Sequence, residues 1–405
     1  MEIPHRPGGL LARILGRERS LLAVDLEAKQ GELREAVGGS RLLVIGAAGS
    51  IGSAFVRQVV AFRPRALHLV DPSENNLVEL VRELRSDRVE LPEDFRSVAV
   101  ALGSLEFDHF LASEPAYDRI VNLAAMKHVR SERDPFSLMR LLMTNVVFLD
   151  DLLRAVARYP QTAVFSVSSD KAVNPASLMG ASKALMERLL LVHSGVTRCA
   201  TTRFANVAFS DGSLLHGFGQ RLAKGQPLAA PTDVRRYFIS AEEAGQMCLL
   251  AVFLGANRDI FVPRPVEGLS LKPLAEVAEL FLRAHGFSPI LCDSEAEARA
   301  IAAEPGFRER GGWPCCFTPS DTTGEKPYEE FVGATERVDY GRFAHVGVIA
   351  GEERLDPMPV RQALAAILRV RQGEAWSITA LAAALSLAVP ELSHRPLGRD
   401  LDRKM

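Results

Sequence analysis

A hydroxyl, an acid and an amine stand side by side in residues 165–183. Ser169, Asp170 and Lys171 directly follow a short apolar run, and a Pro-containing loop and a helix beginning near Leu178 come next. Ligands of open α/β sheets bind outside the carboxyl ends of the strands, where these three side chains would lie. Such groups can hold a substrate oxygen and move protons to and from a substrate. The alternative interpretation is a plain surface ion pair in a loop.

A glycine-rich turn occupies residues 46–52, which read GAAGSIG and lie between a strand-like and a helix-like run. Small residues let the backbone approach a pyrophosphate, and the start of the helix supplies aligned N–H donors. Asp71 ends the next strand, 19 residues after Gly52. An acidic residue at that place bonds the adenosine ribose hydroxyls and repels a ribose phosphate, which favours NAD over NADP. A glycine turn that only packs a helix on a strand is the alternative.

Strand-like and helix-like runs alternate through the first half of the chain. This order predicts right-handed crossovers and a doubly wound, Rossmann-like parallel sheet of the α/β class. We expect strands at residues 41–46, 66–70, 96–101, 119–123, 163–167 and 200–204, and helices at residues 53–62, 75–85, 136–157 and 178–192. Later in the chain we expect a helix at 241–254, a strand at 259–262, an irregular stretch at 264–345 that is turn-like at 313–316, and helices within 357–390.

These runs suggest four parts. Residues 1–40 are expected to form an N-terminal helical arm, and residues 41–205 the NAD-binding Rossmann domain. Residues 206–345 are expected to form a smaller substrate-binding lobe with some segments returning to the sheet. Residues 346–405 are expected to form a helical extension used in packing or assembly.

Composition excludes several classes of protein. Of the 405 residues 47% are hydrophobic and 24% charged, as in an ordinary globular protein. With 48 Lys and Arg against 50 Asp and Glu, no bulk field attracts nucleic acid or an anionic membrane. We expect no membrane span, because no run of about 18 apolar residues occurs, and no signal peptide. Sparse cysteines without zinc-site spacing predict free thiols in a reducing cytoplasm and no metal; they are Cys199, Cys248, Cys292, Cys315 and Cys316.

A family resemblance emerges from motifs that occur in a fixed order. They are GAAGSIG (46–52), NLAAMKHV (122–129), SVSSDKAVNPASLMGASK (166–183), RFANV (203–207), RRYF (235–238) and TGEKPYEE (323–330). With them the chain resembles the capsule and O-antigen polysaccharide biosynthesis branch of the extended short-chain dehydrogenases, over about residues 40–345. That branch contains the UDP-N-acetylglucosamine 4,6-dehydratases. The resemblance implies an NAD-dependent lyase with a UDP-sugar substrate, a GDP-sugar being the alternative, and a homo-oligomer built through helices that flank the sheet.

The reaction implied by the resemblance oxidises carbon 4 of the sugar, eliminates water across carbons 5 and 6, and returns the hydride to carbon 6. It implies Asp170 as the acid for the leaving hydroxyl and Lys171 as the base at carbon 5. Both would have to be neutral, and burial disfavours both charges. Ser169 would hydrogen-bond the carbon 4 oxygen, and Lys183 would hold the nicotinamide ribose.

Met179 is the main departure from the pattern. It lies four residues before Lys183 and therefore on the same helix face, where ordinary relatives carry a tyrosine. A thioether cannot take a proton, so the group that deprotonates the carbon 4 hydroxyl is left open. The candidates are Asp170, Lys127 and a water relay. In addition, Ser169 replaces the usual Thr, and residues 322–326 lack an Arg expected near the phosphates.

The resemblance also implies the remaining binding residues. Cofactor contacts are expected from Gly46, Gly49, Ser50, Ile51, Gly52, Asp71, Ser73, Leu123, Ala124, Ala125, Lys127, Asn145 and Lys183. Substrate contacts are expected from Lys127, His128, Met179, Asn206, Arg236 and Glu325.

Two other functions compete with the dehydratase. One is a nucleotide-sugar epimerase or oxidoreductase of the same fold, and the other is a non-catalytic NAD-binding protein. The Asp170–Lys171 pair favours elimination of water, whereas the absent tyrosine gives weak support to a non-catalytic role.

Overall fold

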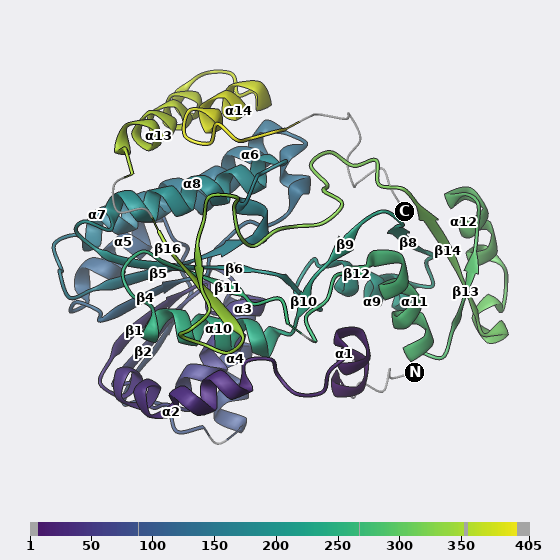
Figure 1. Ribbon diagram of the computed structural model, residues 1–405, viewed down its shortest axis with the longest axis horizontal. Coiled ribbons are helices and arrows are strands. Elements are labelled where there is room, and N and C mark those ends of the chain that lie inside the picture. Colours follow the sequence, from purple (N-terminus) through teal and green to yellow (C-terminus); the bar gives the residue numbers. More distant parts are fainter. Residues whose placement is uncertain (1–6, 88, 267, 352–354, 395–405) are drawn as a thin grey trace.

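A large twisted sheet forms the centre of the computed structural model, which describes residues 7–394 except 88, 267 and 352–354 (Figure 1). Within these residues the sheet has nine strands in the order β3-β2-β1-β4-β5-β6-β11-β16-β15. The strands from β3 to β11 run parallel, and β16 and β15 are antiparallel to their neighbours. The predicted doubly wound α/β fold is therefore confirmed. The strands are β1 (Arg41–Ile45), β2 (Ala66–Val70), β3 (Asp94–Val98), β4 (Arg119–Asn122), β5 (Ala163–Ser169), β6 (Arg198–Phe204), β11 (Asp259–Pro263), β15 (Val338–Asp339) and β16 (Val346–Ala350).

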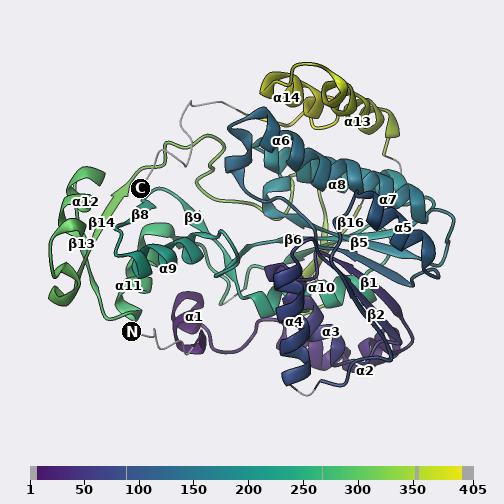
Figure 2. The same cartoon turned by 180° about the vertical axis from the view of Figure 1, so that it is seen from behind.

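Helices cover both faces of this sheet, and Figures 1 and 2 show the two layers from opposite sides. Because both faces are covered, β1 and β2 are buried at every residue. One layer contains α2 (Ala23–Gly38), α3 (Ser50–Val60), α4 (Glu74–Ser86) and α10 (Ala241–Leu254). The other contains α5 (Leu105–Ser113), α6 (Pro135–Leu142), α7 (Phe148–Val156) and α8 (Leu178–His193). The helix predicted at 136–157 is interrupted by a π-helical turn, Met143–Val147, between α6 and α7.

A smaller lobe follows β6. Its three-stranded sheet has the order β13-β14-β8, and its buried side chains form a separate apolar cluster. The elements are β8 (Leu228–Pro231), β13 (Ser288–Leu291), β14 (Gly312–Thr318), α9 (Leu214–Lys224), α11 (Leu274–Ala284), α12 (Glu295–Ala303) and the 3-10 turn Phe307–Arg310. Two short pairs join it to the main sheet: β7 (Asn206–Val207) with β10 (Phe238–Ile239), and β9 (Arg235–Arg236) with β12 (Lys272–Pro273).

The expectation of irregular structure at 264–345 is wrong for much of that stretch. Residues 313–316, expected in a turn, lie in β14, where Trp313 and Cys315 are fully buried among apolar side chains. Pro314 suggested a turn because proline is rare inside strands, but burial of Trp313 and Cys315 outweighs that preference. All five cysteines are buried and unpaired.

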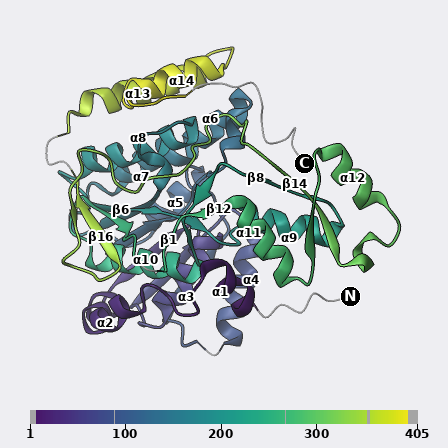
Figure 3. The ribbon, with the colours of Figure 1, turned by 45° about the vertical axis from the view of Figure 1, so that its right-hand side comes forward.

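The terminal parts pack on opposite regions of the molecule. The N-terminal part contains α1 (Pro7–Leu15), beside α11, and α2, and Arg17 between them forms an ion pair of 2.6 Å with Glu243 of α10. The C-terminal helices α13 (Pro357–Gln372) and α14 (Ile378–Ser386) cover α6 and α8 (Figure 3). Residues 346–350, expected at the start of the helical extension, instead form β16. Residues 1–6 and 395–405 of the expected arm and extension lie outside the described residues.

Helices able to span a membrane would have to be long and apolar. No helix in the described part of the chain meets both conditions.

Candidate active site

The glycine turn fits a dinucleotide because its glycines leave the backbone uncovered by side chains. Gly46 has a φ of +76°, and a Cβ there would lie 2.6 Å from the backbone nitrogen of Ala124. A Cβ on Gly52 would overlap the carbonyl oxygen of Gly46. Strand, turn and helix α3 therefore pack without side chains between them, and the first amides of α3 face the carboxyl edge of the sheet. Gly49, Ser50 and Ile51 complete this turn.

Asp71 lies beside the same turn, at the end of β2. Its carboxylate accepts hydrogen bonds from the backbone N–H groups of Ala48, at 3.0 Å, and Ser73, at 2.8 Å. These bonds leave lone pairs on both oxygens for further donors. The structure thus brings together the predicted turn, Asp71 and Ser73. The Ser50 hydroxyl donates to the Asp211 carboxylate at 2.9 Å, a contact from the smaller lobe that the sequence did not indicate.

Asn145 joins two predicted parts of the site. It lies in the π-helical turn, and its side chain both accepts from the backbone N–H and donates to the backbone carbonyl of Met126, each at 2.9 Å. It also donates to the Ser182 hydroxyl of α8 at 3.0 Å. Asn145 therefore anchors the segment after β4, which holds Leu123, Ala124 and Ala125, to α8. Its contact with a cofactor stays a prediction.

Ser169 and Asp170 form a hydrogen-bonded pair at the end of β5. The Ser169 hydroxyl donates to Asp170 Oδ1 at 2.8 Å and accepts from the Lys171 backbone N–H at 3.2 Å. A 3-10 turn, Asp170–Ala172, follows. Asp170 is 3% exposed, and burial raises its pKa; the Lys171 charge opposes this shift and Glu329 reinforces it. The direction agrees with the expected protonated acid.

Lys171 differs from the expectation. Its ammonium lies 2.8 Å from Glu329 Oε1 and 3.8 Å from Asp170 Oδ1. Burial alone lowers the pKa of Lys171, but the carboxylates of Asp170 and Glu329 outweigh burial and raise this pKa above its ordinary value. The expectation that burial favours a neutral Lys171 is therefore wrong for this arrangement of charges, because it left out Glu329.

The loop at residues 323–330 brings further charges to Lys171. Glu329 is 3% exposed and lies 2.7 Å from the Lys326 ammonium and 3.7 Å from the Arg236 guanidinium. Arg236 is buried and also pairs with Glu325. The structure thus places the predicted Arg236 and Glu325 in one ionic cluster with Lys171. Glu329 and Lys326 were missed as site residues, although both belong to the recognised TGEKPYEE string.

Lys183 and Met179 lie in the first turns of α8 and are more deeply buried than Lys171. The Lys183 ammonium donates to the backbone carbonyl of Val167 in β5 at 2.9 Å. Burial lowers the pKa of Lys183 to about 8, with Glu187 opposing. Met179 is 2% exposed and belongs to the apolar cluster between the sheet and its covering helices. Its expected contact with substrate stays a prediction.

Lys127 and His128 face a loop of the smaller lobe rather than the cluster around Glu329. The Lys127 ammonium donates to the Ser210 hydroxyl at 3.1 Å, and burial lowers its pKa while Asp211 opposes. Burial also lowers the pKa of His128. Asn206 lies in β7, where its backbone N–H donates to Tyr237 at 3.1 Å.

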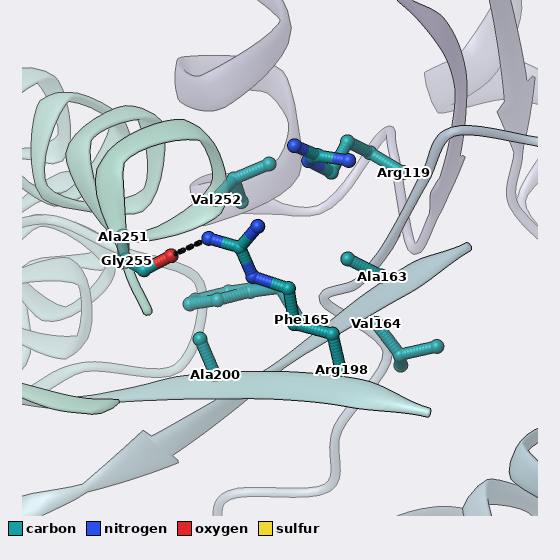
Figure 4. A pocket seen from close by; sticks show the side chains of 9 residues that line it. All are labelled: Arg119, Ala163, Val164, Phe165, Arg198, Ala200, Ala251, Val252 and Gly255. Atoms are coloured by element: carbon teal, nitrogen blue, oxygen red, sulfur yellow. Dashed lines mark hydrogen bonds between the residues drawn. The ribbon is translucent and has the colours of Figure 1, made fainter. Parts of the chain in front are cut away.

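A small hollow on the other edge of the sheet is not part of this site (Figure 4). It lies at the amino ends of β4, β5 and β6, against the end of α10. Arg198, one of its lining residues, donates to the carbonyl of Gly255. Ligands of doubly wound sheets bind at the opposite, carboxyl edge, where the residues above converge.

The chain belongs to the polysaccharide biosynthesis protein family, whose sequence model matches residues 42–308. It is 30% identical over 285 residues to the probable polysaccharide biosynthesis protein EpsC of Bacillus subtilis, a match that covers 68% of this chain and 47% of EpsC. It is also 30% identical over 274 residues to an uncharacterized membrane protein of Methanocaldococcus jannaschii, covering 65% of this chain and 77% of that protein. The match to EpsC thus spans about half of that relative.

One relative carries a defined activity in its name. A UDP-N-acetylglucosamine 4,6-dehydratase (inverting) of Campylobacter jejuni is 25% identical over 239 residues, which cover 56% of this chain and 67% of that enzyme.

Solved structures share the fold. The dTDP-glucose 4,6-dehydratase DesIV of Streptomyces venezuelae, solved as a double mutant with NAD bound, is 20% identical with a TM-score of 0.55, covering 72% of this chain and 88% of DesIV. The UDP-glucose 4-epimerase of Thermotoga maritima, solved with UDP-glucose, is 17% identical with a TM-score of 0.53, covering 72% of this chain and 89% of the epimerase. Because one fold serves both reactions, the fold does not decide between them.

Proposed function

We propose that this protein is an NAD-dependent nucleotide-sugar 4,6-dehydratase that acts on a UDP-sugar, with UDP-N-acetylglucosamine as the first candidate. The observation that carries the proposal is the Ser169–Asp170–Lys171 group at the carboxyl end of β5, in which Asp170 is buried. Burial raises the pKa of Asp170, which suits a carboxylic acid that donates a proton. The relationship to the Campylobacter enzyme supports the same substrate class.

The cofactor would be held by groups that are already arranged for it. The bare turn of Gly46, Gly49 and Gly52 would receive the pyrophosphate, and Asp71 the adenosine ribose. Lys183 would reach the nicotinamide ribose from α8. NAD supplies reversible oxidation at carbon 4 of the sugar, which acidifies the proton at carbon 5.

The side chains around Asp170 would then perform the elimination. Ser169 would donate a hydrogen bond to the carbon 4 oxygen. Lys171 would take the proton from carbon 5 while Asp170 gives its proton to the hydroxyl that leaves carbon 6 as water. Lys171 must first lose its own proton to solvent, and the carboxylate of Glu329 at 2.8 Å opposes that loss. When the hydride is restored to carbon 6, Lys171 would give carbon 5 a proton exchanged with solvent, and Asp170 would be reprotonated by solvent, which takes up the proton released from the carbon 4 hydroxyl.

The diphosphate would bind to the cationic part of the same cluster. Arg236 presents a planar, permanently charged fork, and Lys326 lies on the loop that carries Glu329. Both now contact carboxylates of that loop, with Glu325 and Glu329 as partners. A bound diphosphate would compete with Glu329 for these cations, so substrate binding and the charge on Lys171 would be coupled.

An epimerase is the second candidate, since the Thermotoga epimerase has the same fold. Incubation of the purified protein with UDP- and GDP-sugars, followed by mass spectrometry, separates the candidates. A product lighter by one water supports the dehydratase. An isomer of unchanged mass supports the epimerase, and no product from any sugar supports a non-catalytic NAD-binding protein.

A further inference from the structure

The C-terminal helices form a layer outside the active-site helix. α13 and α14 pack across α6 and α8, as Figures 1 and 3 show. Ile367 of α13 and Leu385 of α14 are fully buried in the same apolar cluster as Leu185 of α8. Arg188 of α8 adds an ion pair of 2.6 Å with Glu391, just beyond α14. The layer is thus part of the folded core around α8.

Beyond α14 the chain reaches the catalytic loop itself. The backbone N–H of Ser393 donates to the carbonyl of Pro175 at 3.0 Å. Pro175 lies between Lys171 and the start of α8. The next residue, His394, places its Nε2 3.4 Å from Glu132 Oε2. Ser393 therefore contacts the loop that follows Asp170, and His394 contacts the carboxylate of Glu132.

Glu132 connects this contact to α8. It is 8% exposed, and its other oxygen accepts from the backbone N–H of Met179 at 2.8 Å. The next residue, Gly180, packs so closely on the loop that a Cβ would overlap the carbonyl oxygen of Lys171. A change in the position of Met179 is therefore passed directly to the backbone of Lys171.

We propose that the C-terminal segment 357–394 positions the catalytic loop, with Glu132 and His394 as positioning residues. His394 lies 3.4 Å from Glu132 Oε2 without a hydrogen bond, the other oxygen of Glu132 accepts from the first turn of α8, and that turn packs on the backbone of Lys171. The inference rests on the proposed function, because the loop it positions carries Asp170 and Lys171. A small displacement of aligned catalytic groups is sufficient to slow a reaction strongly.

The test compares three variants of the full chain: His394→Ala, His394→Gln and Glu374→Gln. His394→Ala should lower kcat for dehydration of UDP-N-acetylglucosamine by about 10- to 100-fold, with KM nearly unchanged because the diphosphate contacts remain. His394→Gln should recover most of the rate, since its amide can donate to Glu132. Glu374→Gln changes an exposed glutamate of the same segment; it is the matched control and should keep the wild-type rate.

Hydrogen exchange gives a readout that needs no substrate. In His394→Ala the amide of Met179 should exchange faster than in the wild type, because local opening exposes it, whereas Glu374→Gln should leave it protected. Wild-type kcat and unchanged exchange in His394→Ala would overturn the inference, as would equal losses in Glu374→Gln. Absence of turnover in the wild type would contradict only the proposed function, because the exchange comparison still decides the positioning role.

Discussion

Replacement of Glu329 by glutamine tests how Lys171 keeps its proton. Lys171 Nζ lies 2.8 Å from Glu329 Oε1 and 3.8 Å from Asp170 Oδ1, so Glu329 is the nearer carboxylate. Glutamine keeps the shape of the side chain and removes its charge. The substitution should therefore lower the pKa of Lys171 and increase the neutral fraction of its amine at neutral pH.

The contact distance sets the size of the effect. Two unit charges 2.8 Å apart attract by about 6 kcal/mol at an effective dielectric constant of about 20, which corresponds to about four pH units. Part of this effect on the pKa of Lys171 is offset, because Glu329 also raises the pKa of Asp170. Without Glu329, Asp170 ionises more readily and holds the Lys171 proton more strongly. We expect the pKa of Lys171 to fall, because the nearer of its two carboxylate partners has lost its charge.

The pH dependence of kcat/KM is the assay. Lys171 acts as a base only when neutral, so the dehydration rate should rise as pH passes through the pKa of Lys171, and in Glu329→Gln this rise should occur at lower pH. Glu330→Gln, an exposed glutamate in the same loop that contacts Asn174, is the matched control and should keep the wild-type profile. A rise at unchanged or higher pH in Glu329→Gln would refute the reasoning.

Three further substitutions test other parts of the site. Lys171→Met should lower turnover by about 10²–10⁴-fold while the protein still binds NAD, which analysis of the bound nucleotide would check; normal turnover would exclude Lys171 as the base. Asp71→Asn keeps an acceptor for the turn but removes the charge, so NAD should bind about tenfold more weakly and NADP relatively better, as titration of both would show. Met179→Leu should cost less than about 1.5 kcal/mol of stability and keep most activity, whereas Met179→Tyr overpacks the core by about 1–3 kcal/mol and should not speed dehydration. A large gain in rate for Met179→Tyr would show that the site still depends on a phenol.

The sheet and its cofactor edge could be predicted because their signals are local. Strands β1, β2 and β5 contain short apolar runs next to helical runs, and the strand–turn–helix order around Gly46 is contained in about 20 residues. Asp71 could be placed from the same segment, since it ends the next strand. The lobe was harder, because strands such as β14 contain proline, which is rare inside strands.

The ionic cluster around Lys171 could not be predicted because it depends on distant contacts. Glu329 is 158 residues from Lys171 in the sequence, and only the folded lobe brings the two together. Nothing local to the Asp170–Lys171 pair indicates a second carboxylate, so burial was the only effect that sequence reasoning could weigh. The contact of His394 with Glu132 likewise joins a residue inside the family match, which covers residues 42–308, to a residue beyond it, and no motif contains both residues.

The mass of the product formed from UDP-N-acetylglucosamine in heavy water tests the central claim most directly. The proposed mechanism removes the proton of carbon 5 and later replaces it from solvent, while water leaves from carbons 5 and 6. The account therefore predicts a UDP-sugar that has lost one water and carries one deuterium at carbon 5. A product that keeps the full mass of the substrate, with its carbon 6 hydroxyl intact, would contradict it.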